Sequence, residues 1–322
     1  MKKSKFFRYS LLLSIFLFSI NALSKSFIPK KDISTLQADS QVTKVSPITT
    51  YTTINNEHTL NALGTTISME EGAERILEKI GHPNRTVETE MGFEYYVYNN
   101  NYNKLLFVAI KDNKVVGFYT DSIDFNYLGL TPDSNFDDIN HVLDSQYSMD
   151  YIITHSTDTH TLHILIDKIG TKNITGILLL DADLKYIGHT ENTMKNSELL
   201  VYDLTNSIRK KNGIPLLSWS STAAKAARKH SIDMAKQGYF DHYNLNGKSP
   251  GDRLREEGIN YSNIGENIIT GYGGAIISTH AWYNTPEHRE NILNKNYNSL
   301  GVGFTYQEDR NFKTYITQKF YR

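Results

Sequence analysis

The chain has no cysteine, and this absence excludes disulfide bonds, zinc ribbons and thiol nucleophiles. It also has no excess of either charge, because 34 Lys and Arg stand against 35 Asp and Glu. No overall charge therefore draws the chain to nucleic acid or to an anionic surface. What it does have is 39% hydrophobic residues, enough to build cores, and a length of 322 residues that suggests two domains.

The N-terminus has the pattern of a secretory signal peptide. The basic segment MKKSKFFR precedes the apolar run YSLLLSIFLFSINA, and small residues follow, which predicts a signal peptide over residues 1–24 cleaved near Ser24. The alternative is an uncleaved membrane anchor, although the run is short for a spanning helix, which needs about 20 apolar residues. A signal peptide without cysteine downstream is typical of a secreted or cell-surface protein of a Gram-positive bacterium. Residues 25–60 are polar and rich in Ser and Thr, and we expect a flexible linker there.

Residues 61–190 predict an α+β domain made of two degenerate repeats, each a helix followed by an antiparallel meander. Leu63-Gly64 matches Leu128-Gly129, and residues 114–122 resemble residues 173–181. Ser68 with Glu71 predicts a capping box at the first helix. The segment has no paired acids, nucleophile elbow or phosphate loop. Alternating aromatic residues in its strands could line a ligand groove but are more typical of core packing: Tyr95, Tyr96, Tyr98 and Phe118.

Residues 191–322 change character and predict an α+β domain with helices packed on a small sheet. Ser197 is expected to cap the first helix and Gly213 to end it. Further helices are expected over 221–238, 249–258, 274–284 and 285–294, and the chain closes with strands over 299–306 and 312–321.

Five motifs in this second domain carry a family resemblance through their order and spacing: WSSTAAKAARKHSIDMA, YFDH, GENI, WYNTPEHRENIL and LGVGF. Over residues 197–322 the chain resembles the CAP superfamily, named for cysteine-rich secretory proteins, antigen 5 and pathogenesis-related 1. Its cysteine-free secreted bacterial members are the most similar. The upstream segment EMGFEYYVYNNNYNKLLFVAIKDNKVVGFYTDS resembles the CAP-associated N-terminal domain. The resemblance implies a C-terminal α-β-α sandwich with a central cleft over residues 191–322, preceded by the CAP-associated domain over 61–190.

In the family, histidines and acidic residues line this cleft. Carried over to this chain, the resemblance places the two histidines at His242 and His288 and the acid at Glu266. A second acid is often found after the tryptophan of the following helix, but residues 282–285 contain no carboxylate. A four-ligand cavity is therefore not expected.

Two chemistries are open to these three side chains. Two neutral imidazoles and a carboxylate can bind Zn²⁺ and leave a position for water. His288 lies in the first turn of a predicted helix, where the helix dipole favours the neutral imidazole that a metal needs. The alternative is a network of hydrogen bonds that ties loops to the sheet, since a buried glutamate needs such partners.

Neighbouring residues are expected to have structural roles. His230 and His280 lie inside helix patterns, which favours packing, and adjacent helix residues do not face each other, so His230 and Ser231 are not a nucleophile and its base. Arg289 could pair with Glu290, with Glu266 or with a backbone carbonyl. Trp219 and Trp282 are expected to anchor the core.

Three functions follow as hypotheses. The first is a non-enzymatic extracellular binding module for a lipid, a peptide or a cell-wall component, with no nucleic-acid partner and with membrane contact only through an uncleaved N-terminus. The second is a zinc-dependent hydrolase of peptide or cell-wall material, with His242 and His288 as ligands and Glu266 as ligand or general base. The third is a structural protein of an envelope or spore layer. No cofactor is certain, and zinc is the one that the residues allow.

Overall fold

The computed structural model describes residues 58–144, 146, 150–308 and 313–322. The predicted signal peptide and most of the predicted linker lie outside this part. Strand β1 (Thr59–Ala62) begins before the predicted linker ends, and Leu60 is fully buried, so the linker prediction extends too far. Within the described ranges, no helix is both long enough and apolar enough to cross a membrane.

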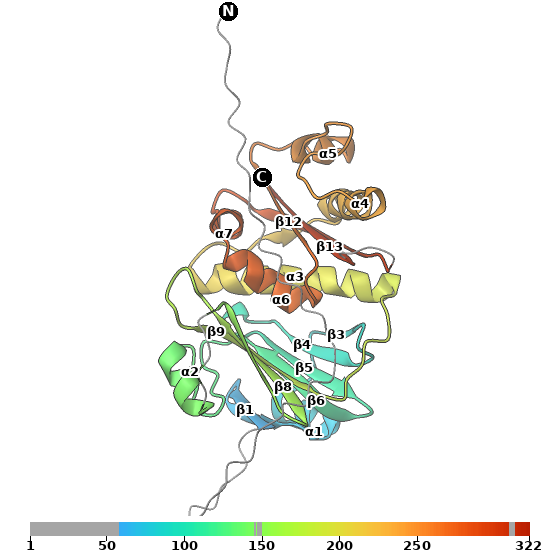
Figure 1. The fold of residues 1–322 in the computed structure, drawn as a ribbon. Coiled ribbons are helices and arrows are strands. Elements are labelled where there is room, and N and C mark those ends of the chain that lie inside the picture. The colour runs from blue at the N-terminus through green and yellow to red at the C-terminus, as the bar shows by residue number, and fades with distance from the viewer. Residues whose placement is uncertain (1–57, 145, 147–149, 309–312) are drawn as a thin grey trace, which may run out of the picture. The chain divides into compact units, whose positions relative to one another are not determined.

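A seven-stranded antiparallel sheet with the order β3-β4-β5-β6-β9-β8-β7 organises the N-terminal part (Figure 1). A hairpin and two short helices accompany it in the described chain. The bounds are β1, β2 (Thr65–Ser68), α1 (Ala73–Ile80), β3 (Arg85–Glu88), β4 (Glu94–Tyr98), the 3₁₀ helix η2 (Tyr102–Lys104), β5 (Leu106–Lys111), β6 (Lys114–Thr120), α2 (Phe136–Val142), β7 (Ile152–Ser156), β8 (His160–Ile166) and β9 (Ile174–Asp181).

The two predicted repeats form the two halves of this single sheet. Their last strands, β6 and β9, pair antiparallel at its centre, with Phe118 opposite Leu179. Leu63-Gly64 and Leu128-Gly129 both adopt positive φ at each residue, so the matching dipeptides make matching tight turns. The predicted capping box is wrong for α1. The helix begins after Gly72, which has no side-chain cap, and Glu71 instead accepts from the Ser68 N–H at 3.2 Å outside the helix.

The C-terminal part is the predicted α-β-α sandwich. Its four-stranded sheet has the order β10-β12-β13-β11. Helix α4 covers one face, and α3 and α6 lie on the other (Figure 1). The bounds are α3 (Glu191–Lys211), β10 (Ser218–Trp219), α4 (Ser221–Gln237), α5 (Pro250–Glu256), β11 (Ile264–Thr270), α6 (Gly274–Tyr283), α7 (Pro286–Leu293), β12 (Ser299–Tyr306) and β13 (Thr314–Tyr321).

Two predictions for this part need correction. Helix α3 begins at Glu191, where Thr190 and Thr193 form the capping box, and Ser197 lies inside the helix, where its Oγ donates to the Thr193 carbonyl at 3.0 Å. The sheet also contains β10 and β11, which the sequence did not predict as strands. Strand β11 was missed because Glu266 and Asn267 interrupt its apolar pattern, yet both are buried.

One hydrophobic cluster joins the two domains. It combines Tyr95, Phe107 and Tyr119 from the seven-stranded sheet with Leu204 of α3 and Trp282 of α6. The opposite face of that sheet packs against α1 and α2 in a second cluster. Of the four aromatic side chains that could have lined a groove, three are therefore core residues: Tyr95, Tyr98 and Phe118. The fourth, Tyr96, is partly buried.

Candidate functional site

Glu266 on β11 is the centre of a buried polar cluster. Its Oε1 accepts a hydrogen bond from His242 Nδ1 at 2.9 Å, and its Oε2 accepts from Arg253 Nη2 at 2.8 Å. The ammonium group of Lys319 also donates to Oε2. Lys319 lies directly opposite Glu266 in the pairing of β11 with β13, so the strand register sets this contact. The carboxylate therefore has three cationic or hydrogen-bonding partners and little contact with solvent.

The surroundings of Glu266 keep it ionised. Burial would raise its pKa, but the hydrogen bond from His242 and the charges of Lys319 and Arg253 lower the pKa to about 2. Burial lowers the pKa of Lys319 to about 8, although the charge of Glu266 opposes this shift. At neutral pH the cluster thus holds a carboxylate between two cations.

Arg253 ties this cluster to the loop that carries His242. It donates to the carbonyls of His242 and Lys248, each at 2.8 Å, as well as to Glu266. Arg253 lies in the last turn of the short helix α5, whose N-terminus is closed by the predicted Ser249 cap, with Asp252 completing a capping box. The position of His242 is therefore fixed through the same arginine that neutralises Glu266.

His288 lies in the first turn of α7, as the sequence predicts. Its carbonyl accepts from Asn267 Nδ2 at 3.1 Å, while its Nδ1 is buried and has no hydrogen-bond partner among the described residues. Burial lowers the pKa of His288, and a charge on His242 lowers it further, so the imidazole is neutral near pH 7. The neutral state is the one that the helix position suggested, but burial is its main cause.

Several members of the cluster were not singled out from the sequence. Arg253 and Lys319 give no motif signal, although a lysine inside the apolar strand pattern of β13 was a clue. Asn291 donates to Asn267 Oδ1 at 2.9 Å and to the Glu266 carbonyl. His230 was expected to pack inside α4. It is buried there, bonds the Asp241 carbonyl at 3.0 Å and approaches Glu266 to 3.9 Å.

The other structural expectations can also be located. Ser231 bonds the Gly303 carbonyl and Thr317, and Trp282 is fully buried. Trp219 is half-buried against Tyr202. Arg289 pairs with Asp167, which the sequence did not suggest, and also donates to the Tyr283 carbonyl.

These residues do not fit a zinc ion. Arg253 Nη2 donates to both Glu266 oxygens, to Oε1 at 3.0 Å and to Oε2 at 2.8 Å, and Lys319 also donates to Oε2. A metal would have to displace Arg253 and Lys319, leaving two buried charges unpaired. Within the described part of the chain, no group of three or more His, Asp or Glu side chains could hold a metal ion. The zinc-ligand hypothesis for His242, Glu266 and His288 therefore finds no support in this geometry.

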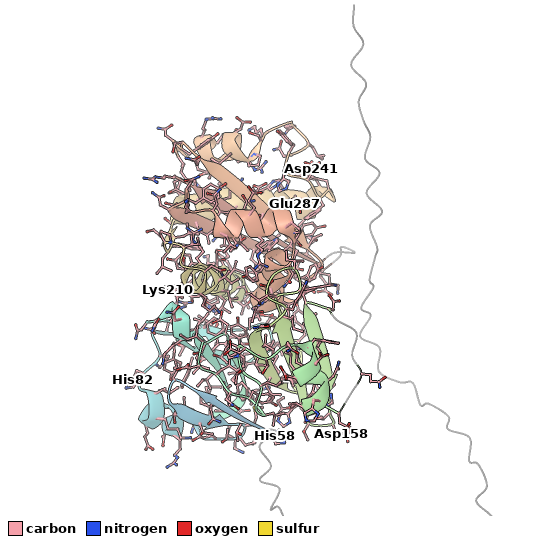
Figure 2. All side chains as sticks on the ribbon, turned by 90° about the vertical axis from the view of Figure 1, so that its left-hand side faces the viewer. His58, His82, Asp158, Lys210, Asp241 and Glu287 are labelled. Atoms are coloured by element: carbon pink, nitrogen blue, oxygen red, sulfur yellow. The ribbon has the colours of Figure 1, made fainter. Side chains whose placement is uncertain are left out.

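The loop around His242 exposes apolar side chains. Phe240, Tyr243 and Leu245 are 47%, 58% and 61% exposed, and the imidazole of His242 is itself 45% exposed. Asn244 holds the loop, because its Oδ1 accepts from two backbone N–H groups farther along. Asp241 and Glu287, the sequence neighbours of His242 and His288, both lie on the C-terminal part (Figure 2).

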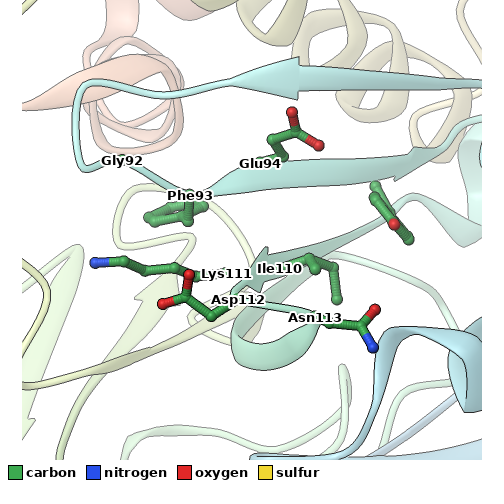
Figure 3. Close-up of a pocket in the computed structure, with 8 residues that line it drawn as sticks. Gly92, Phe93, Glu94, Ile110, Lys111, Asp112 and Asn113 are labelled. Atoms are coloured by element: carbon green, nitrogen blue, oxygen red, sulfur yellow. The ribbon is translucent and has the colours of Figure 1, made fainter.

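A surface depression lies away from these residues, in the N-terminal part. It has a volume of about 340 Å³ and is formed where the β3–β4 and β5–β6 turns meet (Figure 3). Its lining residues all belong to the N-terminal part: Gly92, Phe93, Glu94, Tyr96, Ile110, Lys111, Asp112 and Asn113. The depression is open and contains none of the three predicted site residues, so the histidine cluster remains the candidate site.

Comparison with known proteins agrees with this architecture. Residues 202–320 match the cysteine-rich secretory protein family, and residues 69–186 match the CAP-associated N-terminal family. The uncharacterised membrane protein YlbC of Bacillus subtilis is 27% identical over 290 residues, which cover 78% of this chain and 82% of the relative. The uncharacterised protein YkwD of the same organism is 41% identical over 107 residues, which cover 33% of this chain and 42% of the relative.

Solved structures show the same fold. An extracellular protein with an SCP domain from Bacillus anthracis has a TM-score of 0.66 at 22% identity and covers 89% of this chain and 100% of its own. A cysteine-rich secretory protein from Staphylococcus aureus has a TM-score of 0.62 at 16% identity, and the match covers 81% of this chain and 93% of the Staphylococcus protein. These structures show the fold, and the family matches show that the chain joins a CAP-associated N-terminal domain to a CAP domain of the cysteine-rich secretory protein family.

Proposed function

We propose that the chain is a secreted, non-enzymatic binding module whose ligand contacts the face formed by His242, His288 and the apolar loop at residues 240–245. The observation that carries this proposal is the state of Glu266. A carboxylate with a pKa of about 2, held by Arg253 and Lys319, is a poor general base at neutral pH. The acid that a hydrolase would need is thus committed to structure.

The composition of the exposed face supports an amphipathic ligand. Phe240, Tyr243 and Leu245 offer apolar contact area, and the half-exposed imidazole of His242 offers a polar group in the same loop. His288 lies near enough to His242 for the two rings to interact electrostatically. The unpartnered Nδ1 of His288 is a buried polar atom that a ligand group could satisfy. A lipid, a peptide and a cell-wall fragment all combine apolar and polar groups, and these are the classes to test.

Secretion is part of the proposal. A basic segment followed by an apolar run at the N-terminus supports export. The structural relative from Bacillus anthracis is described as extracellular, whereas YlbC is described as a membrane protein. An export signal that is cleaved in one protein and retained in another would reconcile the two descriptions. Mass spectrometry of the mature N-terminus distinguishes the cases, because cleavage near Ser24 is expected here.

The binding proposal is tested with the full chain and three probes: phosphatidylglycerol vesicles, purified peptidoglycan fragments and an oligopeptide library. We expect one class to bind, and His242→Ala, His288→Ala and Phe240→Ala each to weaken it roughly tenfold, about 1.4 kcal/mol. His82→Ala is the control, because His82 is exposed on the N-terminal part. Binding that all four variants retain, or hydrolysis of a probe that His288→Ala abolishes, would refute the proposal.

A further inference from the structure

The turn between β8 and β9 of the N-terminal domain contacts the helix that carries His288. Asp167 begins this turn, and its carboxylate accepts from the backbone N–H groups of Gly170 at 2.8 Å and Thr171 at 3.0 Å. Its side chain is almost fully buried. The two hydrogen bonds fix the orientation of the carboxylate before any partner is considered.

Arg289, the residue after His288, binds this carboxylate with both terminal nitrogens. The Nη1–Oδ1 and Nη2–Oδ2 distances are 2.5 Å and 2.9 Å, a bidentate geometry that defines the guanidinium plane. The guanidinium also stacks on the Tyr283 ring at 3.8 Å and donates to the Tyr283 hydroxyl at 2.8 Å. An arginine held on both sides leaves little freedom for the first turn of α7.

The bend between α6 and α7 is held by the same turn. The backbone N–H of Lys168 donates to Asn284 Oδ1 at 2.7 Å, and Asn284 Nδ2 donates to the Ile166 carbonyl at 2.9 Å. From the CAP domain, Asn267 binds the His288 carbonyl. Thus Asn267 of β11 contacts His288 directly, while the turn of the N-terminal domain contacts its neighbours Asn284 and Arg289.

We infer that Asp167 is a positioning residue for His288, so that the N-terminal domain completes the ligand-binding face of the CAP domain through the turn at residues 167–172. The functional part of this inference rests on the proposed role of His288 in ligand contact. The structural part does not depend on any ligand. The N-terminal domain then acts as a component of the binding site in addition to linking it to the rest of the chain.

Gly170 offers a test that keeps both charges. A Cβ at this position would lie 2.2 Å from Asp167 Oδ2 and 2.7 Å from Arg289 Nη2, so Gly170→Ala must displace the ion pair. Gly72→Ala is the matched control, because its Cβ would meet no atom within 4 Å. The readouts on the full chain are amide hydrogen exchange along α7 and the NMR signals of the His288 ring at a fixed pH.

For Gly170→Ala we expect exchange of the α7 amides to rise at least tenfold and the His288 ring signals to shift, while α4 keeps its protection. Unchanged α7 exchange and ring signals would overturn the inference. Should Gly170→Ala fail to fold, Arg289→Lys, which keeps the charge but loses the bidentate contact, decides by the same readouts. If α7 and His288 respond but wild type binds none of the three probes, the proposed function fails while the positioning role stands.

Discussion

At the scale of single residues, Glu266 shows how a charged side chain is accommodated in the CAP core. Removing a carboxylate from water costs several kcal/mol, and only direct contacts with cations and donors offset this cost. Arg253, Lys319 and His242 provide those contacts. Each partner then depends on Glu266 in turn, because a buried arginine or lysine without it would be unpaired.

The buried titratable groups predict loss of stability in acid. Burial lowers the pKa of His230 to about 4 and of His280 to about 3, from an ordinary 6.5, and Glu266 falls from 4.5 to about 2 despite its burial. Each group binds fewer protons folded than unfolded, so its stabilising effect is complete above the unfolded pKa and is lost as the pH falls toward the folded pKa. We expect the free energy of unfolding to drop by about 3 kcal/mol or more between pH 7 and pH 4.

Urea denaturation at pH 7, 5.5 and 4 measures this drop. His280→Gln is an informative variant, because it removes one of the titrating groups from the contact with Tyr119 and should flatten the profile. A free energy of unfolding that stays constant from pH 7 to pH 4 would contradict the assigned protonation states.

Sequence reasoning brought His242, Glu266 and His288 together only through the family resemblance. Local patterns could not identify Arg253 or Lys319. The contact of Arg253 with Glu266 depends on the position of α5 in the fold, and that of Lys319 depends on the register of β11 against β13. The expected zinc role of the three residues followed from their donor types. That expectation left out the neighbouring cations, because no local pattern places Arg253 or Lys319 beside Glu266.

At the scale of elements, the motif LGVGF shows how one strand packs against a helix on each of its two faces. In β12, Leu300, Val302 and Phe304 face the core shared with α3. Gly301 and Gly303 point the other way, where a Cβ would lie 2.1 Å and 2.0 Å from backbone atoms of α4. The alternation of a strand thus explains the glycines, which allow the helix backbone to approach the sheet.

Gly303→Ala is therefore expected to destabilise the protein by about 3 kcal/mol, because the nearest atoms belong to the backbone of α4 and cannot rotate away. The shift in the urea midpoint at pH 7 measures this change. Gly72→Ala serves as the control and should change the free energy of unfolding by less than about 1 kcal/mol. A Gly303→Ala protein as stable as the wild type would show that α4 does not pack on β12 as described.

Helix existence was easier to predict than helix boundaries. Alanine-rich α4 and the capped α5 were predicted close to their observed ends, because their signals are local. The start of α3 was predicted too late, since its true capping box uses Thr190 and Thr193 and leaves Ser197 in the helix interior. Strand β11 was missed because its buried polar residues are stabilised by partners distant in sequence.

At the scale of the whole described molecule, the two domains are joined by a common core and by buried polar contacts. Asp203 of α3 is fully buried and accepts from Asn99 and Tyr102 of the N-terminal domain, each at 2.8 Å. Asp121 pairs with Lys211 at 2.7 Å in the same way. The sequence left open whether the domains contact each other. The short segment that connects them does not indicate which surface of either domain is apolar.

A shared core predicts that the two domains unfold together. Phe118 packs on the far face of the seven-stranded sheet, and Phe118→Ala should cost about 3–5 kcal/mol. Both tryptophans lie in the CAP domain, and Trp282 also belongs to the shared cluster, so their fluorescence reports unfolding of the CAP domain and loss of its contact with the seven-stranded sheet. We expect the fluorescence transition in urea to move with the circular dichroism transition in Phe118→Ala. A fluorescence midpoint that stays at the wild-type value would show that the CAP domain unfolds independently.

The central claim is that Glu266 is a structural anion and that His242 and His288 contact a ligand without a metal. Calorimetric titration of Zn²⁺ into the full chain, beside His242→Ala and His288→Ala, tests it most directly. We predict that the wild type binds no stoichiometric zinc at this site, because Arg253 and Lys319 occupy the Glu266 carboxylate. The two variants should then give the same titration as the wild type. One zinc ion bound per chain with micromolar or tighter affinity, and lost in both variants, would contradict the account and support the hydrolase hypothesis.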